Sequence, residues 1–408
     1  MNIKDLKTAF FQRYGQGDAS ISGELHTFFA PGRVNLIGEH IDYNGGFVFP
    51  AALTIGITAI ARRRQDNTIR LYSLNTEQEV LVDTLGEMNF EEKDGWGNYP
   101  KGVFQFLSRE GYELGGYDIM YWGDLPDGAG LSSSAAIEVL TTFMMLTLES
   151  EKTPVLASTA KGGEPIDRVW LSKFCQQVEN RYIGVNSGIM DQFCVALGKK
   201  DHAILLNTDT LAYEYVPFQL KGYSLVIMNT NHRRELADSK YNERRAECDQ
   251  ALAILNDKYQ YRDLCSASLE AVEELIQDET LRKRAIHVIT ENQRVIQAID
   301  VLKQGDLVAF GQLLNQSHHS LQEDYAVTGT PLDALAHASQ QQPGCLGARM
   351  TGAGFGGCAI ALVKNENVEA FKKNVSAIYS EKTGLKADFY PSQIGEGVYQ
   401  SETFERQA

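Results

Sequence analysis

The chain has 408 residues, 43% hydrophobic and 22% charged, which is the composition of a folded protein long enough to form two domains around one cleft. Its formal net charge of −15 argues against a nucleic-acid-binding protein, because affinity for phosphate backbones comes from clustered Lys and Arg. No segment reaches the roughly 18 apolar residues of a membrane span. The six cysteines form no CxxC pair. We therefore expect a soluble cytoplasmic protein with reduced thiols and neither membrane nor nucleic-acid partners.

Strand-like runs and helical periodicity alternate in the first half of the chain. The strand-like runs are residues 27–38, 54–63, 68–75 and 118–126. Apolar side chains recur every three or four positions along 132–149 and 168–182, which predicts two helices. Between these helices, residues 157–167 form a loose segment that we interpret as a surface insertion.

The second half of the chain is largely helical, with strand character at its start and near its end. Further strand-like runs cover residues 202–218, 223–230, 358–363 and 387–390, and a mixed-charge helical segment begins at 239. This order predicts an α+β fold. We place a soft boundary near residue 213, which gives an N-terminal domain over 1–212 and a C-terminal domain over 213–408.

The stretch PGRVNLIGEHIDYNGG, at residues 31–46, gathers Arg33, Glu39, His40 and Asp42 in a short turn. Carboxylates accept hydrogen bonds from hydroxyl groups, and His can donate or accept, so these last three residues suit a neutral sugar that offers no charge to bind. Two other interpretations stay open, a solvated polar turn and a metal site, although the residues lack a recognised ligand spacing.

The stretch LPDGAGLSSSAA, at residues 125–136, places small residues and three serines at the start of a predicted helix. Glycine lets backbone amides approach a ligand, and a helix N-terminus presents N–H groups and the positive end of the dipole. The pattern predicts an anion site, most simply for the phosphates of a nucleotide. It lacks the Lys of a Walker A loop. A capped helix after a tight turn would explain one Gly and one Ser, but not the whole run.

Two carboxylates lie on adjoining predicted helices. Glu179 falls at the edge of an apolar stripe, and Asp191 is expected in the first turn of its helix, where the helix dipole favours the ionised form. Spacing alone favours a surface Glu and a helix-start Asp over a functional pair.

Gly352, Gly354 and Gly357 match the pattern G-x-G-x-x-G. A dinucleotide-binding loop of this pattern follows a strand and opens a helix. Here we expect the loop to follow the helical stretch LDALAHASQQQ and to run into a strand, which argues against that function. A backbone that packs close to a phosphate or a neighbouring loop remains a plausible interpretation.

The stretch at residues 31–46, the stretch at residues 125–136 and the glycine-rich loop at Gly352–Gly357 resemble, in this order, the first, second and third motifs of the GHMP small-molecule kinases. The segments GRVNLIGEH, DYNGG, GLSSSAA, GIMDQF, ADSKYNERRAEC and TGAGFGG resemble galactokinases in particular, from about Phe28 to Val363. The resemblance implies two α+β domains with the active site between them, the first like the second domain of ribosomal protein S5. It also implies transfer of a phosphoryl group from ATP to O1 of α-D-galactose, with Mg²⁺ as cofactor, by an enzyme we expect to be a monomer.

The resemblance further implies roles for individual residues. Asp191 matches the base that takes the proton of the C1 hydroxyl, and Arg33 matches the cation that stabilises the transferring phosphoryl group. The matches to the sugar site are Glu39, His40, Ile41, Asp42, Gly188 and Tyr241. The matches to the ATP site are Gly128, Ala129, Gly130, Leu131, Ser132, Ser133 and Ser134 at the phosphates, with Trp96 and Tyr99 beside the adenine. The matches to the magnesium ligands are Ser134 and Glu179.

Two alternatives to a galactokinase stay open. Galactokinases often carry Thr where this chain has Ile41, and GEHIDY is also the form seen in N-acetylgalactosamine kinases, whereas Asn44–Gly46 and GIMDQF favour galactose. A sensor paralogue that binds galactose and ATP without turnover is the second alternative. The known sensor pattern lacks the small pair after the serines, and this chain keeps Ala135 and Ala136, so we expect an active enzyme.

Overall fold

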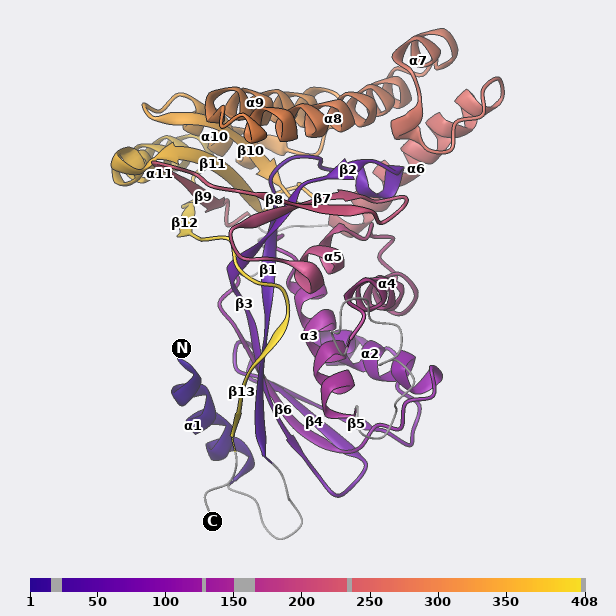
Figure 1. Cartoon of the computed structure of the whole chain (residues 1–408), viewed down its shortest axis with the longest axis vertical. Helices are drawn as coiled ribbons and strands as arrows, with labels where there is room; N and C mark the ends of the chain where they lie inside the picture. Colours follow the sequence, from indigo (N-terminus) through magenta and orange to yellow (C-terminus); the bar gives the residue numbers. More distant parts are fainter. Residues whose placement is uncertain (16–23, 127–129, 150–165, 233–236, 405–408) are drawn as a thin grey trace.

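The structure, a computed structural model, describes residues 1–15, 24–126, 130–149, 166–232 and 237–404. It has two parts with a shared middle (Figure 1). The lower part, indigo to magenta, is built on a long sheet, and the upper part, red to yellow, carries a second sheet under a layer of helices. Most of the predicted surface insertion, residues 157–165, lies outside the described residues.

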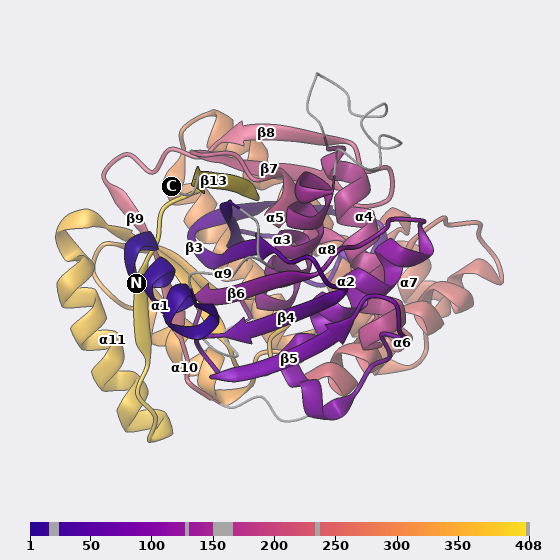
Figure 2. The ribbon, with the colours of Figure 1, turned by 90° about the horizontal axis from the view of Figure 1, so that it is seen from below.

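The lower part is a six-stranded sheet with helices on both faces. The strand order is β13-β1-β3-β6-β4-β5, and Figure 2 shows β3, β6, β4 and β5 side by side in that order. The strands are β1 (Leu25–Asn35), β3 (Pro50–Arg63), β4 (Thr68–Ser73), β5 (Gln78–Asp83), β6 (Tyr117–Gly123) and β13 (Tyr399–Phe404). The helices of this part are α1 (Ile3–Tyr14), α2 (Asn98–Arg109), α3 (Ser133–Leu148), α4 (Arg168–Val178) and α5 (Met190–Leu197).

These helices bury two separate cores. Helices α3 and α5 pack on β1 and β3 and continue the main hydrophobic core of the molecule. Helix α1 packs against β3 and β6, where Leu6, Phe10 and Tyr14 meet Ile60 and Met120 in a smaller cluster. The sheet is therefore covered on both faces, which fixes the end of β1 that carries the first motif.

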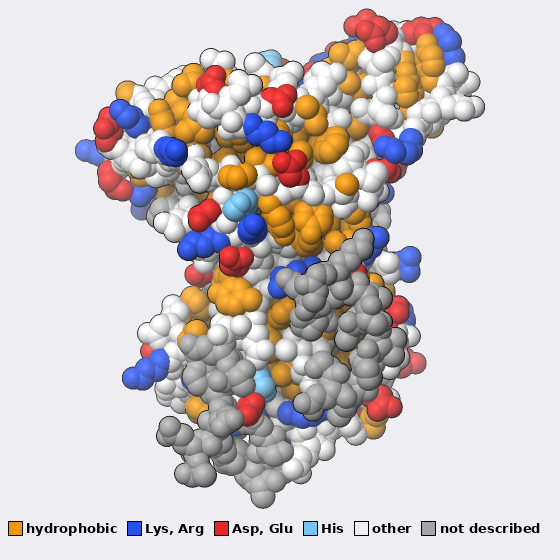
Figure 3. All heavy atoms as spheres, viewed as in Figure 1, with side chains coloured by type: hydrophobic (Ala, Val, Ile, Leu, Met, Phe, Trp, Pro, Cys, Tyr) orange, Lys and Arg blue, Asp and Glu red, His pale blue; other side chains and the backbone are white. Residues whose placement is uncertain are grey.

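The upper part is a four-stranded sheet, in the order β10-β11-β9-β12, packed against helices. The strands are β9 (Tyr223–Asn229), β10 (Cys345–Thr351), β11 (Cys358–Lys364) and β12 (Asp388–Pro391). The helices are α6 (Ala237–Asn256), α7 (Leu269–Leu275), α8 (Glu279–Lys303), α9 (Leu307–Glu323), α10 (Gly329–Gln340) and α11 (Val368–Thr383). The outline narrows on the left side of Figure 3 between the two parts, and charges of both signs are interspersed on that face.

The predicted boundary at residue 213 falls inside a hairpin. A third sheet pairs β2 (Phe47–Val48) with β7 (His202–Asn207) and β8 (Tyr213–Pro217), so the boundary separates two paired strands. In addition, β13 returns from the C-terminal part to pair with β1. The division into residues 1–212 and 213–408 therefore stays a prediction, and two strand pairings cross it.

The predicted α+β fold is confirmed, with one local correction beside the G-x-G-x-x-G loop. The prediction that a helix leads directly into the loop is wrong, because α10 ends at Gln340 and strand β10 intervenes. Glycine at 347 and the fully buried Arg349 interrupt the apolar pattern of strand β10, so its sequence does not show the alternation typical of a strand. The loop joins two antiparallel strands and opens no helix, which upholds the argument against a dinucleotide fingerprint.

Among the described helices, none combines the length and the apolar character that crossing a membrane requires.

Candidate active site

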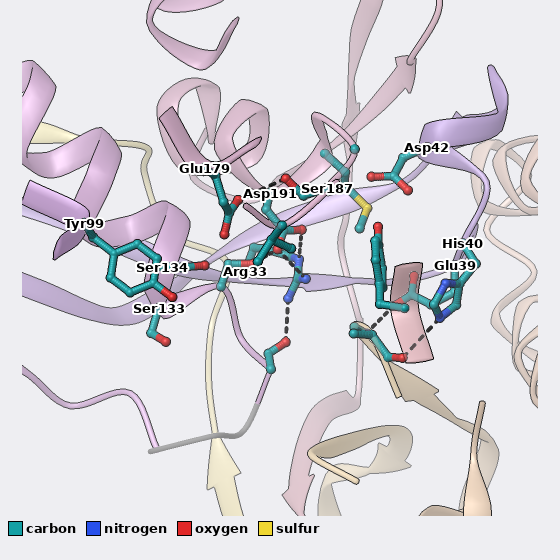
Figure 4. A pocket seen from close by; sticks show the side chains of 18 residues that line it. Arg33, Glu39, His40, Asp42, Tyr99, Ser133, Ser134, Glu179, Ser187 and Asp191 are labelled. Atoms are coloured by element: carbon teal, nitrogen blue, oxygen red, sulfur yellow. Dashed lines mark hydrogen bonds and ion pairs between the residues drawn. The ribbon is translucent and has the colours of Figure 1, made fainter. Parts of the chain in front are cut away.

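A cavity of about 250 Å³ lies where the two parts of the molecule meet. Its walls come from the first motif, the start of α3, the turn before α5, helix α6 and the loop after β10 (Figure 4). Of the predicted residues, the cavity brings together Arg33, Glu39, His40, Asp42, Tyr99, Gly130, Ser132, Ser133, Ser134, Glu179, Gly188, Asp191 and Tyr241. Residues that are distant in sequence thus form one polar site.

Arg33 and Asp191 form a two-point ion pair at the centre of the cavity. Nε and Nη2 of Arg33 donate to the two carboxylate oxygens of Asp191, each at 2.8 Å, and Nη1 donates to the carbonyl of Gly130 at 2.7 Å. Burial disfavours the charge of Arg33, but the neighbouring carboxylates of Asp191 and Glu39 raise its pKa. The pair fixes a permanent cation beside a carboxylate that remains 27% exposed to the cavity.

The start of α3 faces the same carboxylate. Ser132 has a left-handed backbone (φ 63°), and its Oγ donates to Asp191 Oδ2 at 2.6 Å instead of capping the helix. The first-turn amides of this 16-residue helix thus have no side-chain cap, and Ser133 and Ser134 line the cavity beside them. This arrangement can receive an anion. Gly128 and Ala129 lie outside the described residues, and the Leu131 side chain lies in the core.

Glu39 is 1% exposed and is held by the loop after β10. It accepts hydrogen bonds from Thr351 Oγ1 at 3.2 Å and from the backbone N–H of Gly352, and its Oε2 lies 3.5 Å from Nη2 of Arg349. Burial raises the pKa of Glu39, although Arg349 and Arg33 oppose the shift. These contacts therefore fix the position of the Glu39 carboxyl group before any ligand enters.

Gly352 explains why a glycine-rich loop is needed here. Its φ is +83°, and a Cβ at this position would lie 2.7 Å from the carbonyl oxygen of Gly130. The loop therefore packs closely against the second motif while its N–H reaches Glu39 in the first motif. The close approach predicted for this loop is to the neighbouring loop.

Both ring nitrogens of His40 have partners within the protein. Nε2 donates to the carbonyl of Ala353 at 3.2 Å, so Nδ1 accepts from the hydroxyl of Tyr43 at 2.8 Å. Burial lowers the pKa of His40 to about 3, which keeps the ring neutral. The ring thus lines the cavity and holds the turn in place. The side chain of Ile41 is fully buried in the core and lies against Gly46, away from the cavity lining.

Asp42, Gly188 and Tyr241 line the same cavity. A Cβ on Gly188 would lie 1.9 Å from Asp42 Oδ2, so only glycine lets the backbone at position 188 approach the Asp42 carboxyl group this closely. Burial raises the pKa of Asp42 to about 7, with Asp191 and Glu39 contributing in the same direction. Burial also raises the pKa of Tyr241, which hydrogen-bonds to the backbone of Gly188.

Glu179 is 6% exposed and lies at the start of a π-helical turn over Glu179–Ile183. Its Oε2 accepts from Ser187 Oγ at 3.1 Å and from Gln192 Nε2 at 2.5 Å, and its side chain also interacts with Ser134. Carboxylate and hydroxyl oxygens are the donors that Mg²⁺ prefers. No group of three or more His, Cys, Asp or Glu residues that could hold a metal occurs in the described part of the chain.

A second cavity of about 200 Å³ adjoins the first through Tyr99, Ser133 and Ser134. Trp96 lines it together with apolar and small polar side chains from the sheet, and the Trp96 ring N–H is buried without a hydrogen-bond partner among the described residues. A flat heteroaromatic group suits such a lining. The two residues predicted beside an adenine therefore do share a cavity.

Several lining residues carry little signal in the sequence. Ser187 and Met190 lie close to Asp191 in the sequence, and Ala353 follows Gly352 in the glycine-rich loop. Proximity to a motif could have indicated these three residues. Ile57 on β3, Tyr121 on β6 and Asn75 in the turn after β4 all reach the second cavity. Only the pairing of those strands places these side chains together.

Three regions of the chain match known protein families, and each region contains one of the three motifs. Residues 8–63 match the galactokinase galactose-binding signature, residues 98–199 the GHMP kinase N-terminal domain, and residues 298–381 the GHMP kinase C-terminal family. The chain is 48% identical over 403 residues to a galactokinase of Fusobacterium nucleatum, covering 97% of this chain and 98% of that protein. It is 50% identical over 385 residues to a galactokinase of Enterococcus faecalis, covering 93% and 96%.

Solved structures agree with the sequence matches. The Lactococcus lactis galactokinase complexed with galactose superposes with a TM-score of 0.89 at 44% identity, covering 98% of this chain and 100% of that one. The Methanococcus jannaschii mevalonate kinase superposes with a TM-score of 0.64 at 17% identity, which shows a shared fold.

Proposed function

This chain belongs to the galactokinase family of the GHMP kinases, and on that premise we propose that it transfers the γ-phosphoryl group of ATP to O1 of α-D-galactose, giving galactose 1-phosphate and ADP. The observation that carries the proposal is the Arg33–Asp191 pair, which shares one polar cavity with the turn of the first motif and with the uncapped N-terminus of α3. A phosphoryl donor and a hydroxyl acceptor would meet there. The reaction would be the first committed step of galactose catabolism.

The sugar side of the proposal rests on fixed acceptors. Glu39 and Asp42 present carboxyl groups to one cavity, and Tyr241 adds a hydroxyl group. A hexose offers several hydroxyl donors, so such a set can orient it without any charge on the ligand. His40 and Ile41 would contribute by shaping the turn, because the His40 ring nitrogens are engaged and Ile41 lies in the core.

The nucleotide side of the proposal places the adenine in the second cavity, beside Trp96 and Tyr99. The phosphates would then reach the α3 N-terminus at Ser132–Ser134. Ser134 and Glu179 would hold Mg²⁺, which supplies charge neutralisation for the phosphates when it is bound.

In the proposed reaction, Asp191 would receive the proton of the attacking hydroxyl. Its oxygens already accept from Arg33 twice and from Ser132 once, and a carboxylate has about four lone-pair sites, so one remains for a substrate hydroxyl. Arg33 would stabilise the negative charge of the transferring group from the same position. Phosphoryl transfer depends mainly on such positioning and electrostatic stabilisation.

An ADP-release assay with MgATP over a panel of hexoses tests this function. We expect galactose to give the highest kcat/KM. Highest turnover on N-acetylgalactosamine would move the chain to the related kinase activity. Tight galactose binding with no ADP release would indicate the sensor alternative. We further propose a cytoplasmic monomer, and light scattering would measure its mass in solution.

A further inference from the structure

A fully buried acid lies behind the proposed metal ligand Glu179. Glu138, on α3, is 0% exposed, and neither of its carboxyl oxygens has a hydrogen-bond partner within the described residues. Its side chain interacts with that of Gln192, which is also 0% exposed and follows Asp191 on α5. Gln192 in turn donates from Nε2 to Glu179 Oε2 at 2.5 Å. The side chains of Glu138, Gln192 and Glu179, from three different elements, thus form a series of contacts from the core to the site.

An ionised carboxylate cannot be maintained at this position without a donor or a cation. Burial raises the pKa of Glu138 well above its ordinary value, the like charge of Glu179 adds to the shift, and the interaction with Gln192 opposes it. Two buried carboxyl oxygens without a donor, beside a buried amide oxygen that also lacks one, fit the protonated form of Glu138. A protonated carboxyl group carries one O–H donor. The amide oxygen of Gln192 is buried and lacks a donor in the described part of the chain.

We propose that Glu138 acts as a positioning residue: its O–H donates to the amide oxygen of Gln192 and so keeps the Gln192 Nε2–H directed at Glu179. The proposal rests on the proposed function, because it takes Glu179 as the ligand of the magnesium ion. Gln192 and Ser187 both donate to Oε2 of Glu179. Oε1 accepts from neither of them, so it is the oxygen that would face the cation beside Ser134, and an ion of strict octahedral geometry benefits from a carboxylate held in one orientation.

Two substitutions at Glu138 distinguish loss of the O–H donor from loss of the ionisable group and from a change in side-chain volume. Glu138→Gln keeps a donor for the Gln192 oxygen and removes the ionisable group. Glu138→Met keeps a side chain of similar length and removes the donor. Thr142→Val is the matched control, because Thr142 is buried one turn further along α3 and its hydroxyl donates to the backbone carbonyl of Glu138, outside the Glu138–Gln192–Glu179 connection.

The measurement is ADP binding by calorimetry, with Mg²⁺ and with EDTA. We expect Glu138→Met to lower the apparent Mg²⁺ affinity by about tenfold or more, the range found for partners of metal ligands, with metal-free ADP affinity changed less than about twofold. Glu138→Gln and Thr142→Val should both bind MgADP as the parent does. Normal Mg²⁺ affinity in Glu138→Met, or an equal loss in Glu138→Gln, would overturn the proposal.

Infrared spectroscopy keeps the proposal testable if Glu138→Met does not fold. The difference spectrum between the parent protein and Glu138→Gln at pH 8 should contain the C=O band of a hydrogen-bonded carboxylic acid. A carboxylate band in its place would contradict a neutral Glu138. Neither measurement requires turnover, so failure of sugar phosphorylation in the ADP-release assay would be seen separately.

Discussion

Asp191 has its orientation set by three donors before a substrate arrives. Arg33 binds both carboxylate oxygens, and Ser132 binds one of them again from the start of α3. The cost of ordering this carboxylate is met during folding, so binding of the sugar only has to bring a hydroxyl group to a fixed acceptor. The same contacts hold the Arg33 cation beside the helix N-terminus.

We predict that Asp191→Asn retains galactose binding and loses turnover. An amide cannot take a proton at neutral pH, and loss of a positioned general base typically lowers kcat by about 10²–10⁴-fold. Calorimetry with galactose and the ADP-release rate measure the two properties. Asp209→Asn, which changes a carboxylate paired with Arg262 at 3.1 Å, serves as the control. A near-normal kcat in Asp191→Asn would remove the proposed role of Asp191.

The proposed contact of Asp42 with the sugar predicts a galactose affinity that depends on pH. Its pKa of about 7 means that the group loses acceptor capacity as the pH falls below 7. We predict that the dissociation constant for galactose rises as the pH is lowered from 8 to 6, and that this slope is absent in Asp42→Asn. Because the folded state holds this proton more tightly than the unfolded chain, the free energy of unfolding of the sugar-free protein should fall as the pH rises from about 4 to 7. Identical pH profiles for the parent and the variant would contradict both statements.

At the scale of elements, the β10–β11 loop joins the first two motifs. Gly352 touches the Gly130 carbonyl and bonds Glu39, while Thr351 at the end of β10 bonds Glu39 and Asn35. The pattern of glycines predicted a close approach, and the structure identifies its target. The preceding strand could not be predicted, because the buried Arg349 interrupts any apolar pattern, and its partners, the carbonyls of Asn35 and Leu36, are over 300 residues away.

We predict that Gly352→Ala weakens this junction. A side chain at φ +83° costs about 1–3 kcal/mol, and its Cβ would press on the Gly130 carbonyl. Urea unfolding should show a loss of stability in that range, and the KM values for both galactose and ATP should rise. Gly305→Ala is the matched control, since its φ is also positive but nothing lies within 4 Å of the added Cβ. Equal effects of the two variants would mean that backbone strain alone, and not the contact between the loops, is responsible.

At the scale of the whole molecule, the C-terminal part holds the turn of the first motif in the N-terminal part. Glu291 on α8 accepts from the Gly38 N–H at 2.9 Å, and His287 Nε2 donates to the Glu39 carbonyl at 3.1 Å. The motifs and their order indicated two parts around one site. They could not indicate these supporting residues, because nothing in the sequence distinguishes this Glu and this His from other helical residues. Each contacts a residue that is more than 240 positions away along the chain. The strand β13, which pairs with β1, is hidden for the same reason.

The central claim is that a sugar hydroxyl at O1 and the γ-phosphoryl group of ATP meet at the Arg33–Asp191 pair. Phosphorus NMR of the product formed from galactose and MgATP tests it most directly. The proposed reaction predicts a sugar phosphate whose phosphorus signal is split by the anomeric proton of α-galactose, together with an equal amount of ADP. A phosphate coupled to the C6 protons, or ADP without any sugar phosphate, would contradict the claim.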